Sequence, residues 1–334
     1  MTTRGIRLGS CDGVLAEAYD AALYDLDGVL YVGQEPVPHA AHAVALARAA
    51  GMATAFVTNN ASRRPAVVAA HLSELGIPAT PGDVVTSAQA AVRVLRETLP
   101  AGAEVLVVGS AGLAEEVAAG GFRPVRTAGS TVRAVVQGYD PDTGWSQLAE
   151  ATVALRAGAR WVATNTDATL PSPRGPLPGN GAMVAAIRTA TGLEPAVAGK
   201  PEPALHHESV ARVGAQRPLV VGDRLDTDIL GAIRGGADSL LVLTGVVDLR
   251  TAVTAPAGMR PTNVSWDQRG LGSAHPAVEL AAAQASCDGG AATYDNGRIR
   301  LHGKGNGDLR AACALGWRCL DEDLPVDAVE VLEQ

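Results

Sequence analysis

The sequence predicts an α/β fold whose core is a doubly wound, Rossmann-like parallel sheet. Short β-branched runs alternate with alanine-rich amphipathic stretches, and nearly every run ends in Asp, Asn, Thr or Gly. The chain has 334 residues and 47% hydrophobic content, which is enough for a sizeable core and for two domains. Ligands bind at the carboxyl ends of strands in such sheets, so the turns after the strands are where chemistry is expected.

The predicted elements follow one another as βαβ units. The predicted strands cover residues 21–26, 53–60, 134–140, 161–167 and 239–245. Helices are predicted at residues 38–51, 64–76, 145–158 and 203–214. Two further segments, 105–121 and 218–236, each combine a strand, a turn and a helix.

The pattern changes after about residue 250. Residues 293–303 predict a hairpin around Asn296-Gly297, and residues 307–323 predict an amphipathic helix with Trp317 on its apolar side. We expect a small α/β tail packed on the core, for which a partner-binding or dimerising role stays open.

Composition excludes several classes of function. A formal charge of -8 gives no reason to expect nucleic acid or an anionic membrane as partner. No apolar run has the length of a membrane span, and the N-terminus lacks the apolar core of a signal peptide, so a cytoplasmic location is expected. The four cysteines have no metal-ligand spacing and are expected to be thiols: Cys11, Cys287, Cys313 and Cys319.

Four turns carry polar residues that fit one site. Each turn alone is explained equally well as a helix N-cap or a β-turn. In chain order they are DLDGV with Asp25 and Asp27, VTNN with Thr58 and Asn59, GKPEP with Lys200, and GDRLDTDI with Asp223, Arg224, Asp226 and Asp228. Together and in this order they favour a single catalytic site.

These residue types suit phosphoryl transfer. Asp25 can attack phosphorus to form an aspartyl-phosphate, and Asp27, beyond the end of the strand, can act as general acid and then base. Gly28 allows the backbone to turn there. The approach of an anion to a phosphate requires a divalent cation with oxygen ligands, which predicts Mg²⁺ with Asp223 as a second carboxylate ligand.

The other turns supply phosphate ligands. Thr58 and the Asn59 amide can hold phosphate oxygens, and Lys200 adds a positive charge. Only two of the 27 basic residues are lysine, Lys200 and Lys304, which favours a specific role for Lys200. Asp228 is expected to orient metal-bound water from outside the first ring of ligands. Arg224 and Asp226 are expected to be structural.

The four motifs resemble those of the haloacid dehalogenase (HAD) superfamily of phosphohydrolases. The insert between VTNN and GKPEP resembles the large α/β, C2-type cap of the subgroup of p-nitrophenyl, nucleotide, phosphoglycolate and glycerol-phosphate phosphatases. The resemblance implies a core at residues 1–82 and 183–255, a cap at 83–182 and a C-terminal extension at 256–334 packed on the core. Within the subgroup, VVTSAQAA, TGWSQLAEA, TLPSPRGPLPGNG, RTATG and GDRLDTDI most resemble the glycerol-3-phosphate phosphatases.

The resemblance also implies roles for residues. Asp25 is expected to be the nucleophile and Asp27 the acid/base. Thr58, Asn59 and Lys200 are expected to bind phosphate, and Mg²⁺ is expected to be held by Asp25, the Asp27 carbonyl and Asp223. Val29 departs from the family's frequent Thr, without loss of a reacting group.

Specificity is expected to come from the cap. A loop with Asn165, Asp167 and Leu170 is expected to meet the organic part of the substrate, the alternative being a plain connector. Aromatic residues are only 3% of the chain, which offers little for stacking a nucleobase and favours a small phosphorylated metabolite such as glycerol 3-phosphate. Phosphoglycolate, a nucleotide or a sugar phosphate remain alternative substrates.

Two other functional classes are alternatives to a phosphatase. A signalling receiver also uses an acidic pair, a phosphoaccepting Asp, Thr, Lys and Mg²⁺, but it spans only ~120 residues and has no cap. A binding module without activity is the other, and the intact motifs argue against it. A homodimer is compatible with the sequence.

Overall fold

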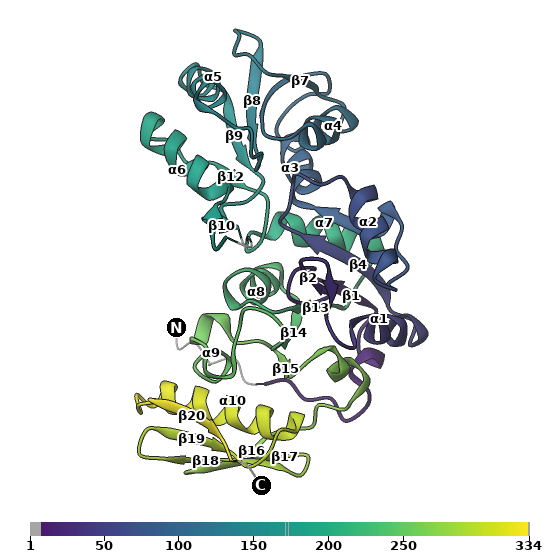
Figure 1. The fold of residues 1–334 in the computed structure, drawn as a ribbon, viewed down its shortest axis with the longest axis vertical. Coiled ribbons are helices and arrows are strands. Elements are labelled where there is room, and N and C mark those ends of the chain that lie inside the picture. The colour runs from purple at the N-terminus through teal and green to yellow at the C-terminus, as the bar shows by residue number, and fades with distance from the viewer. Residues whose placement is uncertain (1–7, 171, 173, 333–334) are drawn as a thin grey trace. The chain divides into compact units, whose positions relative to one another are not determined.

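The computed structural model describes residues 8–170, 172 and 174–332, and its contacts divide the chain into two compact units (Figure 1). The first unit contains the chain up to Phe56, residues 74–77 and everything from Val213 on. The second contains Val57–Ser73 and Pro78–Arg212. Each unit has a parallel sheet with helices between its strands, which confirms the predicted α/β class.

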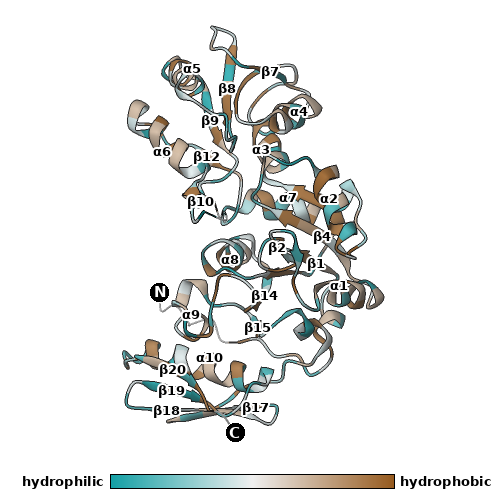
Figure 2. Cartoon of the chain, in the orientation of Figure 1, coloured by the Kyte–Doolittle hydropathy of each residue, from teal (hydrophilic) through white to brown (hydrophobic). Residues whose placement is uncertain are grey.

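The sheet of the first unit contains three motif-bearing strands, β13 (Pro218–Gly222), β1 (Ala21–Tyr24) and β4 (Ala53–Thr58). In spatial order the sheet runs β15 (Asn263–Ser265), β14 (Asp238–Val242), β13, β1, β4 and the short β5 (Val84–Thr86), and the pairs from β15 to β1 and from β1 to β4 are parallel. Every residue of β1 is buried, as expected for a central strand covered on both faces. Apolar side chains dominate β4 in the same way (Figure 2). The central strands β13 and β1 therefore bring Asp223 and Asp25 to neighbouring strand ends.

Short helices complete this part of the first unit. The α-helices are α1 (Ala40–Ala49), α8 (Leu230–Gly235) and α9 (Leu249–Val253). A π-helical turn, η3 (Leu225–Ile229), precedes α8. The 3₁₀ turns are η1 (Leu15–Glu17), η4 (Ala257–Met259) and η5 (Gln268–Gly272), and β2 (Tyr31–Val32) pairs with β3 (Glu35–Pro36).

The C-terminal extension is a five-stranded sheet with one long helix against it (Figure 1). Its strands are β16 (Glu279–Ala281), β17 (Gln284–Cys287), β18 (Gly290–Asp295), β19 (Arg298–Leu301) and β20 (Ala328–Val331), and its helix is α10 (Asn306–Asp321). The predicted hairpin is confirmed, because Asp295 pairs with Arg298 and both turn residues have positive φ. Trp317 is buried in one cluster with Leu241 of β14, so the extension shares the core of the first unit.

The sheet of the second unit is also parallel. Its order is β12 (Ala196–Val197), β9 (Arg160–Ala163), β8 (Val132–Gln137), β6 (Glu104–Val108) and β7 (Arg123–Val125). Its helices are α3 (Ser87–Arg96), α4 (Ala111–Ala119), α5 (Trp145–Arg156), α6 (Asn180–Thr191) and, ending at the unit boundary, α2 (Pro65–Glu74) and α7 (Pro203–Val213). Short segments are η2 (Pro81–Asp83), β5 (Val84–Thr86) and the pair β10 (Thr169–Leu170) and β11 (Leu177–Pro178).

The predicted strands and helices are present, with shorter ends. In the segment 161–167 the strand ends at Ala163, and the polar residues after it form a loop, as expected for Asn165 and Asp167. The four cysteines are free thiols, as expected. Within the described residues no helix has both the length and the apolarity needed to cross a bilayer. The division into core, cap and extension at residues 82, 182 and 255 stays a prediction.

Candidate active site

Asp25 and Asp27 lie in the turn that follows β1. The backbone N–H of Asp25 donates to the Val221 carbonyl (2.9 Å), which continues the pairing of β1 with β13 by one residue. Asp25 is half-buried, whereas Asp27 is exposed. Gly28 has φ +85°, and a Cβ there would collide with the Asp223 carboxylate. This turn therefore needs glycine both for its backbone conformation and for space.

Asp223 directly follows β13 and is completely buried. Its Oδ2 accepts a hydrogen bond from the backbone N–H of Val246 (2.7 Å). A Cβ on Gly245 would also collide with this carboxylate, so the loop after β14 approaches Asp223 with bare backbone. The hydroxyl of Thr244 in the same loop donates to the Gly28 carbonyl (2.7 Å). One loop thus holds both the Asp223 carboxylate and the turn after Asp27.

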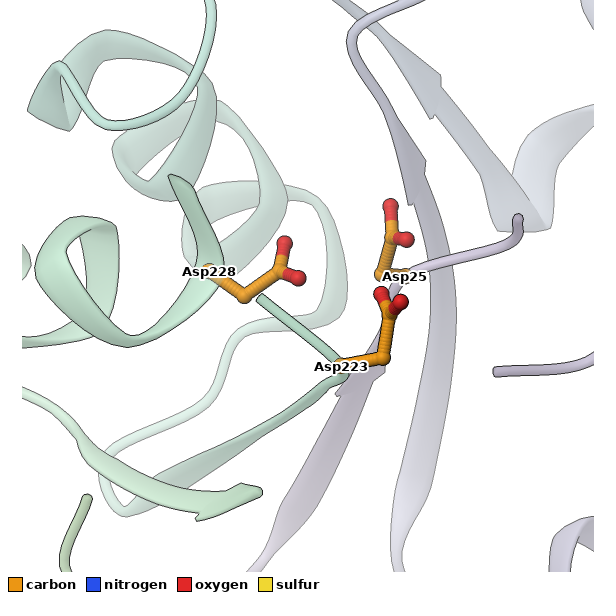
Figure 3. Close-up of side chains that lie close together, drawn as sticks. All are labelled: Asp25, Asp223 and Asp228. Atoms are coloured by element: carbon orange, nitrogen blue, oxygen red, sulfur yellow. The ribbon is translucent and has the colours of Figure 1, made fainter. Parts of the chain in front are cut away.

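Asp228 comes from η3 and completes an acidic cluster with Asp25 and Asp223 (Figure 3). One carboxylate oxygen from each of the three lies within 4.8 Å of the other two. The backbone N–H of Arg224 donates to Asp228 Oδ2 (3.2 Å), which fixes that side chain. Three hard oxygen donors in such a small space fit a divalent cation such as Mg²⁺ or Ca²⁺. The sequence placed Asp228 outside the ring of ligands, and the structure places its carboxylate in the same cluster.

Arg224 and Asp226 form a salt bridge with each other. Arg224 donates to both carboxylate oxygens of Asp226, at 3.0 and 2.8 Å. Hydrogen bonds from Arg224 lower the pKa of Asp226 in spite of its partial burial. This pairing is consistent with the structural role expected for both residues.

In the second unit, Asn59 and Lys200 are joined by two hydrogen bonds. The Lys200 N–H donates to Asn59 Oδ1 (2.7 Å), and Asn59 Nδ2 donates to the Lys200 carbonyl (3.1 Å). Thr58, at the end of β4, is buried, and its hydroxyl accepts the N–H of Asn60 (3.0 Å). A Cβ on Gly199 would lie 2.6 Å from Asn59 Oδ1, so glycine is needed before the lysine. The second and third sequence motifs therefore meet here.

The loop after β9 is tied to the same asparagine. Asn165 Nδ2 donates to the Asn59 carbonyl (2.7 Å), and Asn59 Nδ2 donates to Asp167 Oδ2 (3.2 Å). Leu170 lies farther along the loop, in β10, and is half-buried. The structure thus gathers Asn59, Lys200, Asn165 and Asp167 in the second unit, while Asp25, Asp27, Asp223 and Asp228 belong to the first.

Sequence analysis missed the residues that support these groups. Thr244, Gly245 and Val246 lie after a strand that carries none of the four motifs. Asn180 and Gln137 hold the loop after β9 but look like an ordinary helix start and strand end. The only sequence signal was their position next to a strand end or in the GNG tripeptide at residues 179–181.

The chain is similar to known proteins of one family. A family model described as haloacid dehalogenase-like hydrolase matches residues 22–123, and a related HAD-hydrolase-like model matches residues 197–267. A D-glycerol 3-phosphate phosphatase from Mycobacterium tuberculosis is 49% identical over 317 residues, covering 93% of this chain and 89% of that protein. The chain belongs to the haloacid dehalogenase-like hydrolase family. It is a member of the phosphatase branch, as the sequence predicted.

Other members extend the comparison. An acid sugar phosphatase from Staphylococcus saprophyticus is 37% identical and covers 68% of this chain and 88% of its own length. The solved structure of the M. tuberculosis glycerol phosphate phosphatase with magnesium has a TM-score of 0.85 and 46% identity, covering 96% of each chain. A double mutant of a thermostable NPPase from Geobacillus stearothermophilus has a TM-score of 0.69 and 34% identity, covering 75% of this chain and 96% of its own. The M. tuberculosis enzyme has also been solved with calcium.

Proposed function

We propose that this HAD phosphatase hydrolyses glycerol 3-phosphate to glycerol and phosphate. The observation that carries the proposal is the 49% identity to the M. tuberculosis glycerol 3-phosphate phosphatase over 93% of the chain. The scarcity of aromatic side chains agrees with a small polyol phosphate. The 37% identity to an acid sugar phosphatase favours a sugar phosphate as the second candidate, ahead of phosphoglycolate or a nucleotide.

In the proposed reaction an oxygen of the Asp25 carboxylate attacks phosphorus, and the bond from phosphorus to the glycerol oxygen breaks. Asp27 gives its proton to the departing glycerol oxygen. The Asp27 carboxylate then takes a proton from water, which attacks the aspartyl-phosphate and releases phosphate. The exposed position of Asp27 suits a group that must exchange protons with substrate and water.

We propose Mg²⁺ as the resident cation, held by Asp25, Asp223 and the Asp27 carbonyl, with Asp228 orienting water at the ion. The three-carboxylate cluster supports a divalent cation, and Mg²⁺ suits carboxylate and phosphate oxygen. Bound there, the ion would offset the repulsion between the Asp25 carboxylate and the phosphate. Chelation with EDTA is expected to stop turnover and added Mg²⁺ to restore it. Turnover that is indifferent to chelation would remove the ion from the mechanism.

Thr58, Asn59 and Lys200 are the proposed phosphate ligands. The Asn59 side-chain amide is engaged at both ends by Lys200 and Asp167, so we assign phosphate binding to its backbone N–H. Lys200 supplies the positive charge that stabilises the transition state. Asp167 and Leu170 are proposed to meet the organic part of the substrate, and Asn165 to hold their loop in shape.

A panel of phosphate monoesters tests this function. Purified protein with Mg²⁺ is assayed for released phosphate with glycerol 3-phosphate, a hexose phosphate, phosphoglycolate, a nucleoside monophosphate and p-nitrophenyl phosphate. The expected result is the highest kcat/KM for glycerol 3-phosphate among the metabolites. A clear preference for a hexose phosphate would replace the substrate assignment. A protein that hydrolyses none of them, p-nitrophenyl phosphate included, would overturn the enzymatic function and favour a receiver or binding module.

A further inference from the structure

The GNG tripeptide of the cap segment packs against the loop after β9. Asn180 is its central residue, begins α6 and is only 2% exposed. A Cβ on Gly179 would collide with the Asp167 carbonyl, and one on Gly181 would collide with the Thr166 carbonyl. The two glycines therefore let the start of α6 approach the backbone of this loop closely, which places the Asn180 side chain against it.

The Asn180 side chain binds carbonyls at the ends of two strands of the sheet. Its Nδ2 donates to the carbonyl of Asn165 (2.6 Å), just after β9, and at the longer distance of 3.5 Å to the carbonyl of Gln137, which ends β8. The Gln137 side chain is itself buried, and its Oε1 accepts from Trp161 Nε1 (3.2 Å). Asn180 is thus fixed to the interior of the sheet on one side and to the loop on the other.

Asn165 passes this connection to the phosphate-binding motifs. Its Nδ2 donates to the Asn59 carbonyl (2.7 Å), and its Oδ1 accepts the Asp167 N–H (3.2 Å). The Asn59 side chain in turn holds both polar groups of the Lys200 backbone, through the bonds of 2.7 and 3.1 Å. We call Asn180, Asn165 and Asn59 the amide network. Each member uses a neutral side chain to hold the backbone of the next residue.

The amide network is sensitive to the loss of one hydrogen-bond donor. A buried carbonyl left without its hydrogen bond costs about 1–3 kcal/mol, so removal of Asn180 Nδ2 favours movement of the loop. Asn165, Asn59 and Lys200, which follow Asn180 in the series of hydrogen bonds, are then held less firmly. A displacement of about 1 Å in a catalytic group can lower a rate by about 10²-fold. Loss of the Asn180 donor is therefore expected to lower the reaction rate, although Asn165 and Asn59 stand between Asn180 and Lys200.

We propose that Asn180 is a positioning residue that acts on the reaction through Asn165, Asn59 and Lys200. The proposal rests on the proposed role of Lys200 in phosphate hydrolysis. It gives the PLPGNG segment a function other than substrate contact or a plain connection. It also predicts that the effect of Asn180 depends on the presence of the Lys200 ammonium group.

A double-mutant cycle tests this dependence. Asn180→Asp keeps the shape of the side chain and removes the Nδ2 donor. We expect kcat for p-nitrophenyl phosphate to fall by about 10-fold or more, with KM changed by about 2-fold at most. In a Lys200→Ala background the same substitution is expected to lower kcat by a clearly smaller factor, because the part of the effect that passes through the ammonium group is gone and only the part through the Asn59 backbone remains. Asn180→Ala provides a second donor-free variant without an added charge, should Asn180→Asp fold poorly.

The controls separate the possible failures. Asn296→Asp makes the same change in the exposed turn of the C-terminal hairpin and is expected to leave kcat unchanged. Equal losses from the Asn180 variants with and without Lys200 would show a general structural effect and overturn the proposal, as would wild-type kcat in both variants. Failure of the proposed function would give a different result, because the unmodified protein would not hydrolyse p-nitrophenyl phosphate at all.

Discussion

The acidic cluster of the first unit and the amide network of the second occur at similar places in two similar sheets. Asp25 and Asp223 follow the neighbouring parallel strands β1 and β13, and Asn165 follows β9 beside β8. In the acidic cluster, three carboxyl side chains converge, and backbone N–H groups donate to Asp223 and Asp228. In the amide network, neutral side chains bind backbone carbonyls and N–H groups. Residues at the strand ends thus gather carboxyl groups in the first unit and hold backbone segments in place in the second.

The largest effect is expected when the charge of the acidic cluster is removed at the reacting atom. Asp25→Asn keeps the size of the side chain but replaces the attacking carboxylate with an amide, so turnover is expected to fall below about one per cent of wild type. Steady-state release of phosphate measures this. Asp226→Asn, in the exposed salt bridge with Arg224, is the matched control and is expected to stay near wild type. An active Asp25→Asn enzyme would contradict the nucleophile assignment.

The acidic cluster could be predicted from sequence to a much greater extent than the amide network. Asp25, Asp223 and Asp228 belong to two of the four motifs, which together and in their order predict one site. Asn180 carries no such signal, since Asn is common at the start of a helix for local reasons. Which carbonyls it binds depends on the packing of α6 on β8 and β9, and nothing in the spacing of residues 137, 165 and 180 encodes that contact.

The order of the elements was predictable for a similar reason. Alternating apolar runs and amphipathic stretches specify strands and helices locally, and parallel sheets follow from their alternation. The loop after β9 was also predictable, because polar residues follow the apolar run WVA. The partners of its side chains, of which Asn59 is the main one, were not predictable.

Altered geometry at unchanged charge is tested at Lys200, whose backbone the amide network holds. Lys200→Arg retains the positive charge but replaces a compact ammonium with a wide planar group. We expect kcat/KM to fall by at least about 10²-fold, since a misplaced donor in a preorganised phosphate site costs about 3 kcal/mol. Lys304→Arg, at an exposed position in the extension, is expected to have no effect.

The opposing argument is that arginine binds phosphate well and often through two parallel hydrogen bonds. Near-wild-type kinetics of Lys200→Arg would favour that argument and show that charge alone is sufficient at this position. The phosphatase assignment would be unaffected by such a result.

A smaller effect is expected when the geometry of the acidic cluster changes and its charge does not. Gly245→Ala places a methyl group against the Asp223 carboxylate, which must then move. The apparent affinity for Mg²⁺ is expected to fall by about 10–100-fold. Calorimetric titration with Mg²⁺ measures this without turnover. Gly258→Ala is the control, because a Cβ there has no neighbour within 4 Å among the described residues. Unchanged Mg²⁺ affinity in Gly245→Ala would show that Asp223 does not hold the ion.

The smallest effect on activity is expected at Asp321 of the first unit, whose charge is paired with that of Arg260. Arg260 is buried and donates to both oxygens of Asp321 at 2.7 Å, while its guanidinium lies 5.5 Å from the Trp317 ring centre. The hydrogen bonds from Arg260 are the main cause of the lowered pKa of Asp321. This pair fastens α10 of the extension to the segment after η4, far in sequence from every motif residue.

Asp321→Asn is therefore expected to change stability and not catalysis. Asp321 is 45% exposed, so the loss is discounted to about 1 kcal/mol, or a Tm lower by about 2–4 °C. Because folding lowers the pKa of Asp321, its stabilisation is present at neutral pH and is lost as pH falls below about 4 and through the folded-state pKa. The Tm difference between wild type and Asp321→Asn should therefore shrink as the pH falls through this range, while Asp323→Asn shows no such difference. A fall in kcat at pH 7 with unchanged Tm would contradict this, since it would show that a compensated charge in the extension acts on the reaction as directly as the acidic cluster does.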